Sequence, residues 1–461
     1  MPTRPNLKPT TGYYTSVGII SSIINDPELT EFSDMRGPVT PTTESIRAIG
    51  QQITGYAPKM EAFKRGLIGR IGMVRLQYML FTNPWAFLKK GKLEMGETIQ
   101  QIWLGLATVF PYNPLKSETR FPKMAETEMA SAFHSVNFRE VYKVTINDLE
   151  LTEAFLSLEG MRDFIERVIG SIARSVQYDE FMMYKYLLAQ LFLAGKIRVD
   201  TVAPITASTA NDVVTQVAET TNLFQFPSSD YTMAGNENTT SIENLIVLES
   251  ARANALIKVN SLATAFNIDE VRFQGQVVLF DSLAKFNFRR MAYLMDEDPS
   301  WEPFTREQLD LLGTIDIICM DREFMQLYDS KDQAGTPFIN GEGGYTNYPW
   351  HKWSVLSASP FHNIIAYSPT ASVVTAISLS PGTVTSGKGT MVPFIADVTT
   401  TGFARTDVVF SITTDVTSKS TFIGQDGVLR IGMDETVDDI TVKAVSVADE
   451  TKSATATVSV A

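Results

Sequence analysis

The sequence predicts a mixed α+β body followed by an all-β module at its C-terminal side. Apolar residues repeat at helical spacing between about residues 149 and 195. Short apolar runs at 244–248 and 276–280 are typical of buried strands. Near residue 370 the composition changes, and Thr, Ser and Val make up 42 of the last 91 residues. Because branching at Cβ suits a pleated surface, this last segment is expected to form strands.

A chain of 461 residues is too long for one ordinary domain. We expect an N-terminal arm over 1–60, a body over 61–370 and the C-terminal module over 371–461. Pro, Gly and Thr interrupt the arm, in which short helices are expected at 17–25 and 43–54. Such a segment is not expected to fold alone, and we expect it to lie across a neighbouring molecule.

The segment 74–114 predicts a long hairpin that projects from the body. Two apolar, strand-like limbs flank a polar tip at Lys89, Lys90, Gly91 and Lys92. An isolated pair of strands is marginally stable, and its free edges favour pairing with a partner. The alternative interpretation is an internal hairpin with a solvated basic turn.

A long helix is expected over about 149–195, with Asp148 or Thr152 as its cap. The spacing of Phe155, Leu158 and Met161 continues along one helical face. The aromatic residues between 178 and 186 are interpreted as core residues. The next part of the body, over about 196–320, contains a polar stretch at 206–241 and a helix expected at 252–266; the family resemblance described below implies that it is the axial region.

Alternating strands separated by turn signals predict a β-sandwich in the C-terminal module. The strand-like runs are 407–414, 427–433, 439–447 and 453–460. The turn signals are SPG at 380–382, GKG at 387–389, QDG at 425–427 and VADE at 447–450. This spacing of about ten residues is typical of a sandwich.

Composition and motif searches favour a structural protein over an enzyme. The formal charge of −13 argues against broad contact with nucleic-acid phosphates. The single cysteine, Cys319, excludes a disulfide framework within the chain and is expected to be buried and inert. His134, His351 and His362 lack the spacing of a helical metal site. We therefore expect no catalytic residue, no cofactor and no metal, and neither a signal peptide nor a transmembrane helix.

Three segments resemble the major head proteins of the phi-29-like short-tailed phages. They are NPWAFLKKGKLEMGETIQQIW (83–103), LATAFNIDEVRFQGQVVLFDSL (262–283) and HKWSVLSASPF (351–361). The resemblance implies the Hong Kong 97-type capsid fold, with an N-terminal arm, an extended hairpin loop, a long spine helix and an axial α+β domain. Periodicity alone does not name this fold.

The C-terminal module resembles the bacterial immunoglobulin-like group 2 family. Its opening, VTAISLSPGTVTSGKGTMVPFIADV, and its closing strands DITVKAVSV and TATVSV carry the resemblance. Members of that family often have Trp in the strand where this chain has Phe410. The resemblance implies an immunoglobulin-like sandwich, which by itself does not fix a function.

Together the resemblances imply a major capsid protein that self-assembles into pentamers and hexamers of an icosahedral or prolate phage head. Its expected partners are copies of itself, a scaffolding protein, a portal, and double-stranded DNA enclosed without sequence-specific binding. It is expected in the virion after assembly in the host cytoplasm, with no membrane contact. The alternative is a surface adhesin or carbohydrate-binding protein. The residues expected to contact a neighbouring subunit are Trp85, Phe87, Lys89, Lys90, Lys92, Glu94 and Trp103.

Overall fold

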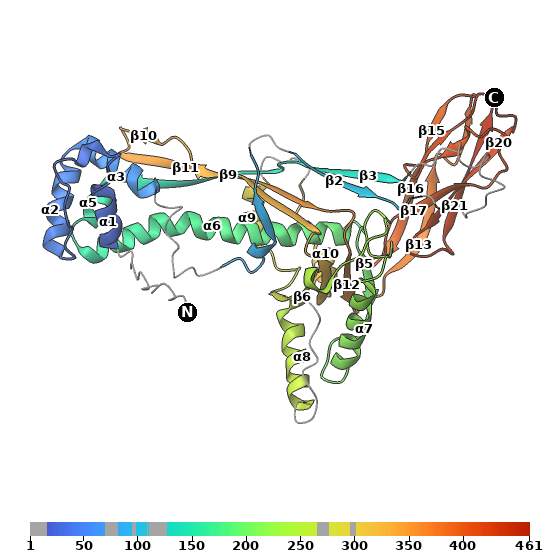
Figure 1. Cartoon of the computed structure of the whole chain (residues 1–461), viewed down its shortest axis with the longest axis horizontal. Coiled ribbons are helices and arrows are strands. Elements are labelled where there is room, and N and C mark those ends of the chain that lie inside the picture. The colour runs from blue at the N-terminus through green and yellow to red at the C-terminus, as the bar shows by residue number, and fades with distance from the viewer. Residues whose placement is uncertain are drawn as a thin grey trace, which may run out of the picture. The chain divides into compact units, whose positions relative to one another are not determined.

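The computed structural model describes residues 16–69, 82–94, 98–107, 109, 127–264, 276–295 and 301–461 (Figure 1). The chain forms two compact units, and it passes between them several times. Unit 1 contains Met1–Glu97, Ser135–Met182 and Leu327–Val355, and unit 2 contains Thr98–His134, Met183–Gln326 and Leu356–Ala461. Among the described helices, none combines the length and the apolar character that crossing a membrane requires.

Unit 1 is built on a five-stranded sheet that is covered by a long helix. The sheet has the order β1-β9-β11-β10, and β4 pairs with β11. Figure 1 shows the part of helix α6 that belongs to unit 1, up to Met182, running along this sheet. The bounds are β1 Lys89–Lys92, β4 Phe138–Asn147, β9 Met325–Ala334, β10 Phe338–Asn340, β11 Tyr345–Ala358 and α6 Leu158–Leu193.

The N-terminal helices belong to the core of unit 1. Helices α1 (Ser16–Ile24) and α2 (Thr43–Thr54) confirm the two helices expected in this part of the chain, and α3 (Ala57–Gly69), which was not expected, follows them. Their apolar faces bury residues such as Ile20 and Ile53 in one cluster with residues of β4, β11 and α6. The described part of the predicted arm therefore packs on its own chain, because its isoleucines recur at helical spacing; residues 1–15 lie outside the described part.

The predicted long helix is interrupted near its start. Helix α5 (Asp148–Ala154) ends before Phe155, and α6 begins at Leu158. Asn147 caps α5 by accepting a hydrogen bond from the Leu149 N–H, and the Ser157 hydroxyl accepts one from the Gly160 N–H. Both side chains satisfy N–H groups that a helix start leaves free, so two separate helices form.

The polar tip of the predicted hairpin is a strand, and its second limb pairs with a segment that the prediction did not include. Strand β1 at Lys89–Lys92 lies parallel to β9, so these residues are part of a sheet and not a turn. Strand β2 (Ile99–Leu104) pairs antiparallel with β3 (Met129–His134), which lies beyond the predicted segment. Of the predicted hairpin, residues 74–81, 95–97, 108 and 110–114 lie outside the described part of the chain.

Unit 2 contains a mixed sheet of order β5-β12-β8-β6-β7. The apolar runs expected as strands form β6 and β7, and the helix expected at 252–266 forms α8, with 265 and 266 outside the described residues. Helix α7 was missed in the polar stretch at 206–241, although it buries Val213 and Val217. The bounds are β5 Arg198–Thr201, β6 Leu245–Ser250, β7 Gln276–Phe280, β8 Ile317–Asp321, β12 Ile364–Ser368, α7 Ala210–Leu223, α8 Ala251–Thr264, α9 Phe288–Leu294 and α10 Arg306–Leu312.

From Val373 onward the C-terminal module consists of strands joined by turns and loops, as its composition predicts. Its sheets are β13-β16, β14-β21-β20-β17 and β15-β19-β18. Residues of all three contribute to one apolar cluster, which includes Phe410, Leu429 and Val442. The bounds are β13 Val373–Ser380, β14 Thr383–Ser386, β15 Met391–Pro393, β16 Ile395–Thr401, β17 Val408–Ile412, β18 Phe422–Ile423, β19 Val428–Arg430, β20 Asp439–Ser446 and β21 Ser453–Val460.

A buried carboxylate joins two loops of the C-terminal module. Glu435 is fully buried and accepts hydrogen bonds from the backbone N–H groups of Thr417 and Ser418 at 3.1 and 3.2 Å. The hydroxyls of Thr417 and Thr421 also donate to it. Burial alone raises the pKa of Glu435, but these donated hydrogen bonds outweigh burial and hold the pKa well below its usual range.

We expect Glu435→Gln to destabilise the C-terminal module by about 3 kcal/mol at neutral pH, because an amide NH₂ would face donors. Since the folded-state pKa is lowered, the carboxylate contributes stability above its unfolded pKa of about 4.3 and loses it as the pH falls further. The difference between wild type and variant should therefore shrink below about pH 4. Hydrogen exchange of the β20 and β21 amides in the full chain measures this difference in stability. The exposed control Glu450→Gln should change these amides by less than about 0.5 kcal/mol; equal effects of the two variants would contradict the assignment.

Candidate functional site

The residues expected at a subunit contact are divided between the two units. Trp85 to Glu94 belong to unit 1, whereas Trp103 belongs to unit 2. Trp85 is 0% exposed, and its ring meets that of Phe181 on α6 edge-on, with centroids 5.3 Å apart. Trp85 is therefore a core residue of its own chain, and its assignment as an anchor on a neighbour is wrong.

Lys89 takes part in a buried cluster of charges in unit 1. Its ammonium lies 2.7 Å from Glu180 and 3.0 Å from Asp329. Lys352, which is 1% exposed, lies within 3.2 Å of Glu180, Asp329 and Asp332. Two ammoniums and three carboxylates thus connect β1, β9 and β11 to α6, so Lys89 meets acidic groups of its own chain rather than those of a neighbour.

The cluster keeps Asp329 and Lys352 charged in spite of burial. Burial alone raises the pKa of Asp329, but the positive charges of Lys352 and Lys89 outweigh burial and lower it. Burial alone lowers the pKa of Lys352, but the charges of Glu180, Asp329 and Asp332 raise it. These charges are therefore interdependent, and the removal of one leaves an imbalance of charge among the rest.

The remaining predicted residues differ in their exposure. Lys92 and Glu94 are exposed, and Phe87 and Lys90 are half-buried. Trp103 is half-buried as well, and its indole N–H donates to the Glu237 carbonyl oxygen at 2.9 Å. The Trp103 ring therefore lies on the face of β2 that is turned toward its own unit.

The opposite face of the β2–β3 hairpin is apolar and exposed. Ile102, Leu104, Met129 and Phe133 are 56%, 65%, 68% and 66% exposed. Leu104 lies opposite Met129 in the antiparallel register, while Ile102 and Phe133 lie opposite polar residues of the same face. We call these four residues the hairpin face. Large contiguous apolar patches are uncommon on the surface of monomeric proteins and often belong to binding surfaces.

The root of the hairpin is fixed by polar contacts within unit 2. The His134 ring is buried, with Nε2 3.0 Å from the Gln101 side-chain oxygen and Nδ1 2.8 Å from the Ser357 hydroxyl. The Gly105 N–H donates to the Glu128 carbonyl oxygen at 2.8 Å and closes the far side of the strand pair. The hairpin face is therefore presented on a supported pair of strands.

Sequence reasoning missed the hairpin face because the predicted hairpin did not include β3. The alternation in IQQIWL from 99 to 104 is visible in the sequence, but the partner MASAFH begins only at Met129. Trp103 was predicted as a contact residue because it is large and aromatic, but it lies on the inward face of β2. The size of a side chain does not tell which face of a strand is exposed. Alternation in both strands together is the signal that identifies Leu104, Met129 and Phe133.

Two reactive side chains of unit 2, those of Cys319 and Ser359, have structural surroundings. Cys319 lies in β8 and is fully buried, and burial raises the pKa of its thiol. The Ser359 hydroxyl lies 2.7 Å from His362 Nδ1, but it also accepts a hydrogen bond from the Phe361 N–H, as a turn-forming serine does. The described residues contain no group of three His, Cys, Asp or Glu side chains placed to hold a metal ion.

Comparison with known proteins identifies capsid proteins. The chain is 29% identical over 418 residues to the major capsid protein of Bacillus phage B103, covering 89% of this chain and 86% of that protein. It is 26% identical over 421 residues to the major capsid protein of Bacillus phage GA-1, covering 88% and 82%. A chain of the capsid structure of Staphylococcus phage Andhra aligns with 65% of this chain and 88% of its own length, at 16% identity and a TM-score of 0.47.

The family match covers the body of the chain. The family described as Phi29-like phage major capsid protein matches residues 38–368, which is more than two thirds of the sequence. The match ends just before the first strand of the C-terminal module, Val373–Ser380. These findings agree with the resemblance carried by the segments 83–103, 262–283 and 351–361, and they do not favour the adhesin alternative. This chain belongs to the Phi29-like phage major capsid protein family.

Proposed function

We propose that copies of this major capsid protein form pentamers and hexamers that close into an icosahedral or prolate head around double-stranded DNA. The hairpin face is the single observation that carries the proposal for how subunits meet. Its four large apolar side chains are exposed on a supported strand pair, and burial against a second copy removes them from water. Identical chains that meet through two different surfaces form a ring when the rotation between neighbours closes.

The contact that we propose differs in its residues from the one expected from the sequence. Ile102, Leu104, Met129 and Phe133 take the place of Trp85 and Lys89, which are occupied within their own chain. Lys92 and Glu94 are exposed and remain proposed rim residues, and Phe87, Lys90 and Trp103 remain proposed as supporting positions. Each contact is expected to be weak, and many simultaneous contacts in a closed shell raise the effective affinity.

We also propose the Hong Kong 97-type fold for the body and an immunoglobulin-like sandwich for the C-terminal module. Helix α6 along a sheet, a separate mixed sheet and a supported hairpin support the former. Sheets around a common apolar core support the latter, with Phe410 in the place where the related family often has Trp. A scaffolding protein and a portal are proposed partners, and assembly is proposed in the host cytoplasm.

Negative-stain electron microscopy of the purified chain tests the proposed function. We expect closed shells or rings of five and six subunits at raised protein concentration, with or without an added scaffolding protein. Particles that stay monomeric under all of these conditions would contradict the proposal. Shells that form equally well after the hairpin face is made polar would contradict only the assignment of the contact.

Assembly is expected to increase from low to moderate salt. Each chain carries a formal charge of −13, so copies repel one another. The range of this repulsion falls from about 30 Å at 0.01 M salt to about 10 Å at 0.1 M. Burial of the hairpin face is not weakened by salt in this range. Light scattering measures the effect, and equal extents of assembly at both salt concentrations would count against it.

A further inference from the structure

We infer that the C-terminal module is held in one orientation on the rest of unit 2 by a latch, rather than tethered flexibly. The latch is the segment Phe403–Asp407, which connects β16 to β17 within the module. Phe403, Ala404 and Arg405 are at most 9% exposed, although they lie in a loop. A loop of a free module would expose these side chains to water, so their burial points to a fixed contact.

The latch bonds to the turn that follows α6. The Thr406 N–H donates to the Gly195 carbonyl oxygen at 3.2 Å, and the Thr406 hydroxyl donates to the Ala194 carbonyl oxygen at 3.1 Å. The backbone N–H groups of residues 194–196 already bond the last carbonyl groups of α6. The module therefore supplies hydrogen bonds to the two carbonyl groups of this turn.

Gly195 makes this approach possible. Its φ of +62° is strained for residues with a side chain. A Cβ at this position would lie 2.7 Å from the Ala404 carbonyl oxygen and 3.2 Å from the Thr406 backbone nitrogen. Any side chain at Gly195 would push the latch away from α6.

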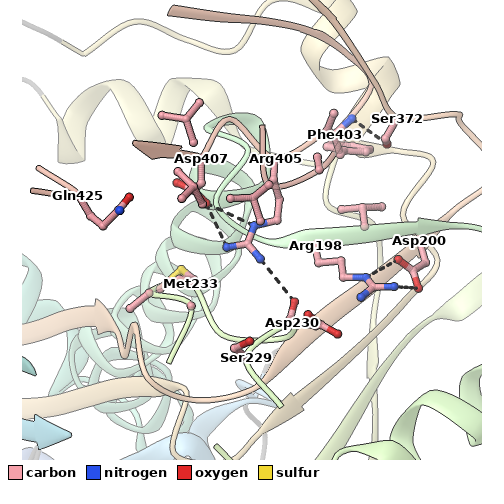
Figure 2. Close-up of a pocket in the computed structure, with 18 residues that line it drawn as sticks. Arg198, Asp200, Ser229, Asp230, Met233, Ser372, Phe403, Arg405, Asp407 and Gln425 are labelled. Atoms are coloured by element: carbon pink, nitrogen blue, oxygen red, sulfur yellow. Dashed lines mark hydrogen bonds and ion pairs between the residues drawn. The ribbon is translucent and has the colours of Figure 1, made fainter. Parts of the chain in front are cut away.

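Arg405 joins the latch to the loop that follows α7 (Figure 2). Its guanidinium donates to the carbonyl oxygens of Asp230, which is labelled in Figure 2, and of Thr232, both at 3.4 Å. Asp407 holds the guanidinium at 3.1 Å and also pairs with Lys196 at 2.8 Å. Phe403 packs edge-on against Phe192 of α6, with centroids 6.1 Å apart. Hydrogen bonds, an ion pair and an aromatic contact thus connect the module to two separate segments.

An open cavity of about 780 Å³ lies beside these contacts. Its lining comes from the latch, from the loop around Met233 and from Gln425 and Val447 of the module. Because no described side chain fills this space, side-chain packing there does not oppose a tilt of the module. The latch contacts oppose it instead, so their loss should release the module.

Hydrogen exchange on the unassembled full chain tests the inference without relying on shell formation. We expect the Thr406 amide to be protected in the wild type and to exchange about tenfold faster in Gly195→Ala and in Arg405→Ala, because each removes latch contacts. Gly195→Ala leaves the sequence of the module unchanged. Its matched control is Gly235→Ala, since Gly235 also has a positive φ of +70° but its Cβ would meet nothing within 4 Å. Amides of β20 and β21 should stay protected in all variants.

Distance measurements between spin labels give the second readout. Labels at Ser208→Cys on the body and Ser453→Cys on the module report the orientation, since the single natural thiol, Cys319, is buried. We expect one narrow distance distribution in the wild type and in Gly235→Ala, and a broad one in Gly195→Ala and Arg405→Ala. A broad distribution in the wild type, or a Thr406 amide that exchanges equally fast in all four proteins, would overturn the inference.

Discussion

Lys352→Met is expected to lower the free energy of unfolding of unit 1 by about 4 kcal/mol, because it leaves three carboxylates with Lys89 as the one remaining cation of the cluster. In the folded chain Lys352 pairs with Glu180, Asp329 and Asp332, and Lys89 reaches two of these. Denaturant unfolding of the unassembled subunit measures the loss through tryptophan fluorescence, since the Trp350 indole donates to Asp332 at 2.7 Å.

The pH dependence of this effect follows from the two pKa shifts. The lowered pKa of Asp329 means that its contribution is present above its unfolded pKa of about 3.9 and is lost as the pH falls below that value. The raised pKa of Lys352 means that its contribution is present below about pH 10.4 and is lost only as the pH rises further. The variant should thus differ from the wild type by a constant amount between pH 5 and 9, and by less below about pH 4.

A matched control separates this cluster from the general effect of removing a lysine. Lys143 is exposed on β4 of the same sheet, so Lys143→Met should change the stability by less than about 0.5 kcal/mol. A loss of less than about 1 kcal/mol for Lys352→Met would show that the cluster does not stabilise unit 1 in the manner described.

The double variant Leu104→Asp, Phe133→Asp is expected to abolish shell formation and leave a folded subunit. Both side chains are exposed by about two thirds in the single chain, so their loss removes little from the subunit core. In an assembled shell the new carboxylates would be buried against a neighbour without partners, which is costly at every one of many contacts. Sedimentation velocity measures assembly, and circular dichroism measures the fold.

The control for this variant keeps the hairpin face apolar. Leu104→Met combined with Phe133→Leu preserves apolar character, and we expect it to assemble like the wild type. Normal shells from the aspartate variant would place the subunit contact elsewhere. An unfolded aspartate variant would instead indicate that the hairpin face is needed within the subunit.

Local patterns in the sequence predicted many elements of the fold. The helices at 17–25 and 43–54 and the strands of the C-terminal module were correct, because their spacing and composition act within short windows. Helix α7 was missed since its polar residues outnumber the buried ones, and tertiary packing of Val213 and Val217 decides its position. The N-terminal helices were assigned to a neighbour because an apolar face does not reveal which chain covers it.

The candidate site was harder to predict because it depends on contacts between distant segments. From the sequence, Lys89 was interpreted as part of a basic tip, whereas in the structure it forms ion pairs with Glu180 and Asp329 of its own chain. Trp85 was interpreted as an anchor on a neighbouring subunit, whereas in the structure its ring packs against Phe181. The hairpin face becomes visible only once β2 is paired with β3, and that register follows from tertiary structure rather than from either strand alone.

Thiol labelling of Ile102→Cys tests most directly whether the hairpin face is covered by a second copy in the shell. Ile102 is 56% exposed in the single chain and Cys319 is buried, so the new thiol is the accessible one among the described residues. We predict rapid maleimide labelling of the free subunit and strong protection in assembled shells. Equal labelling rates in subunits and shells would contradict the proposed contact.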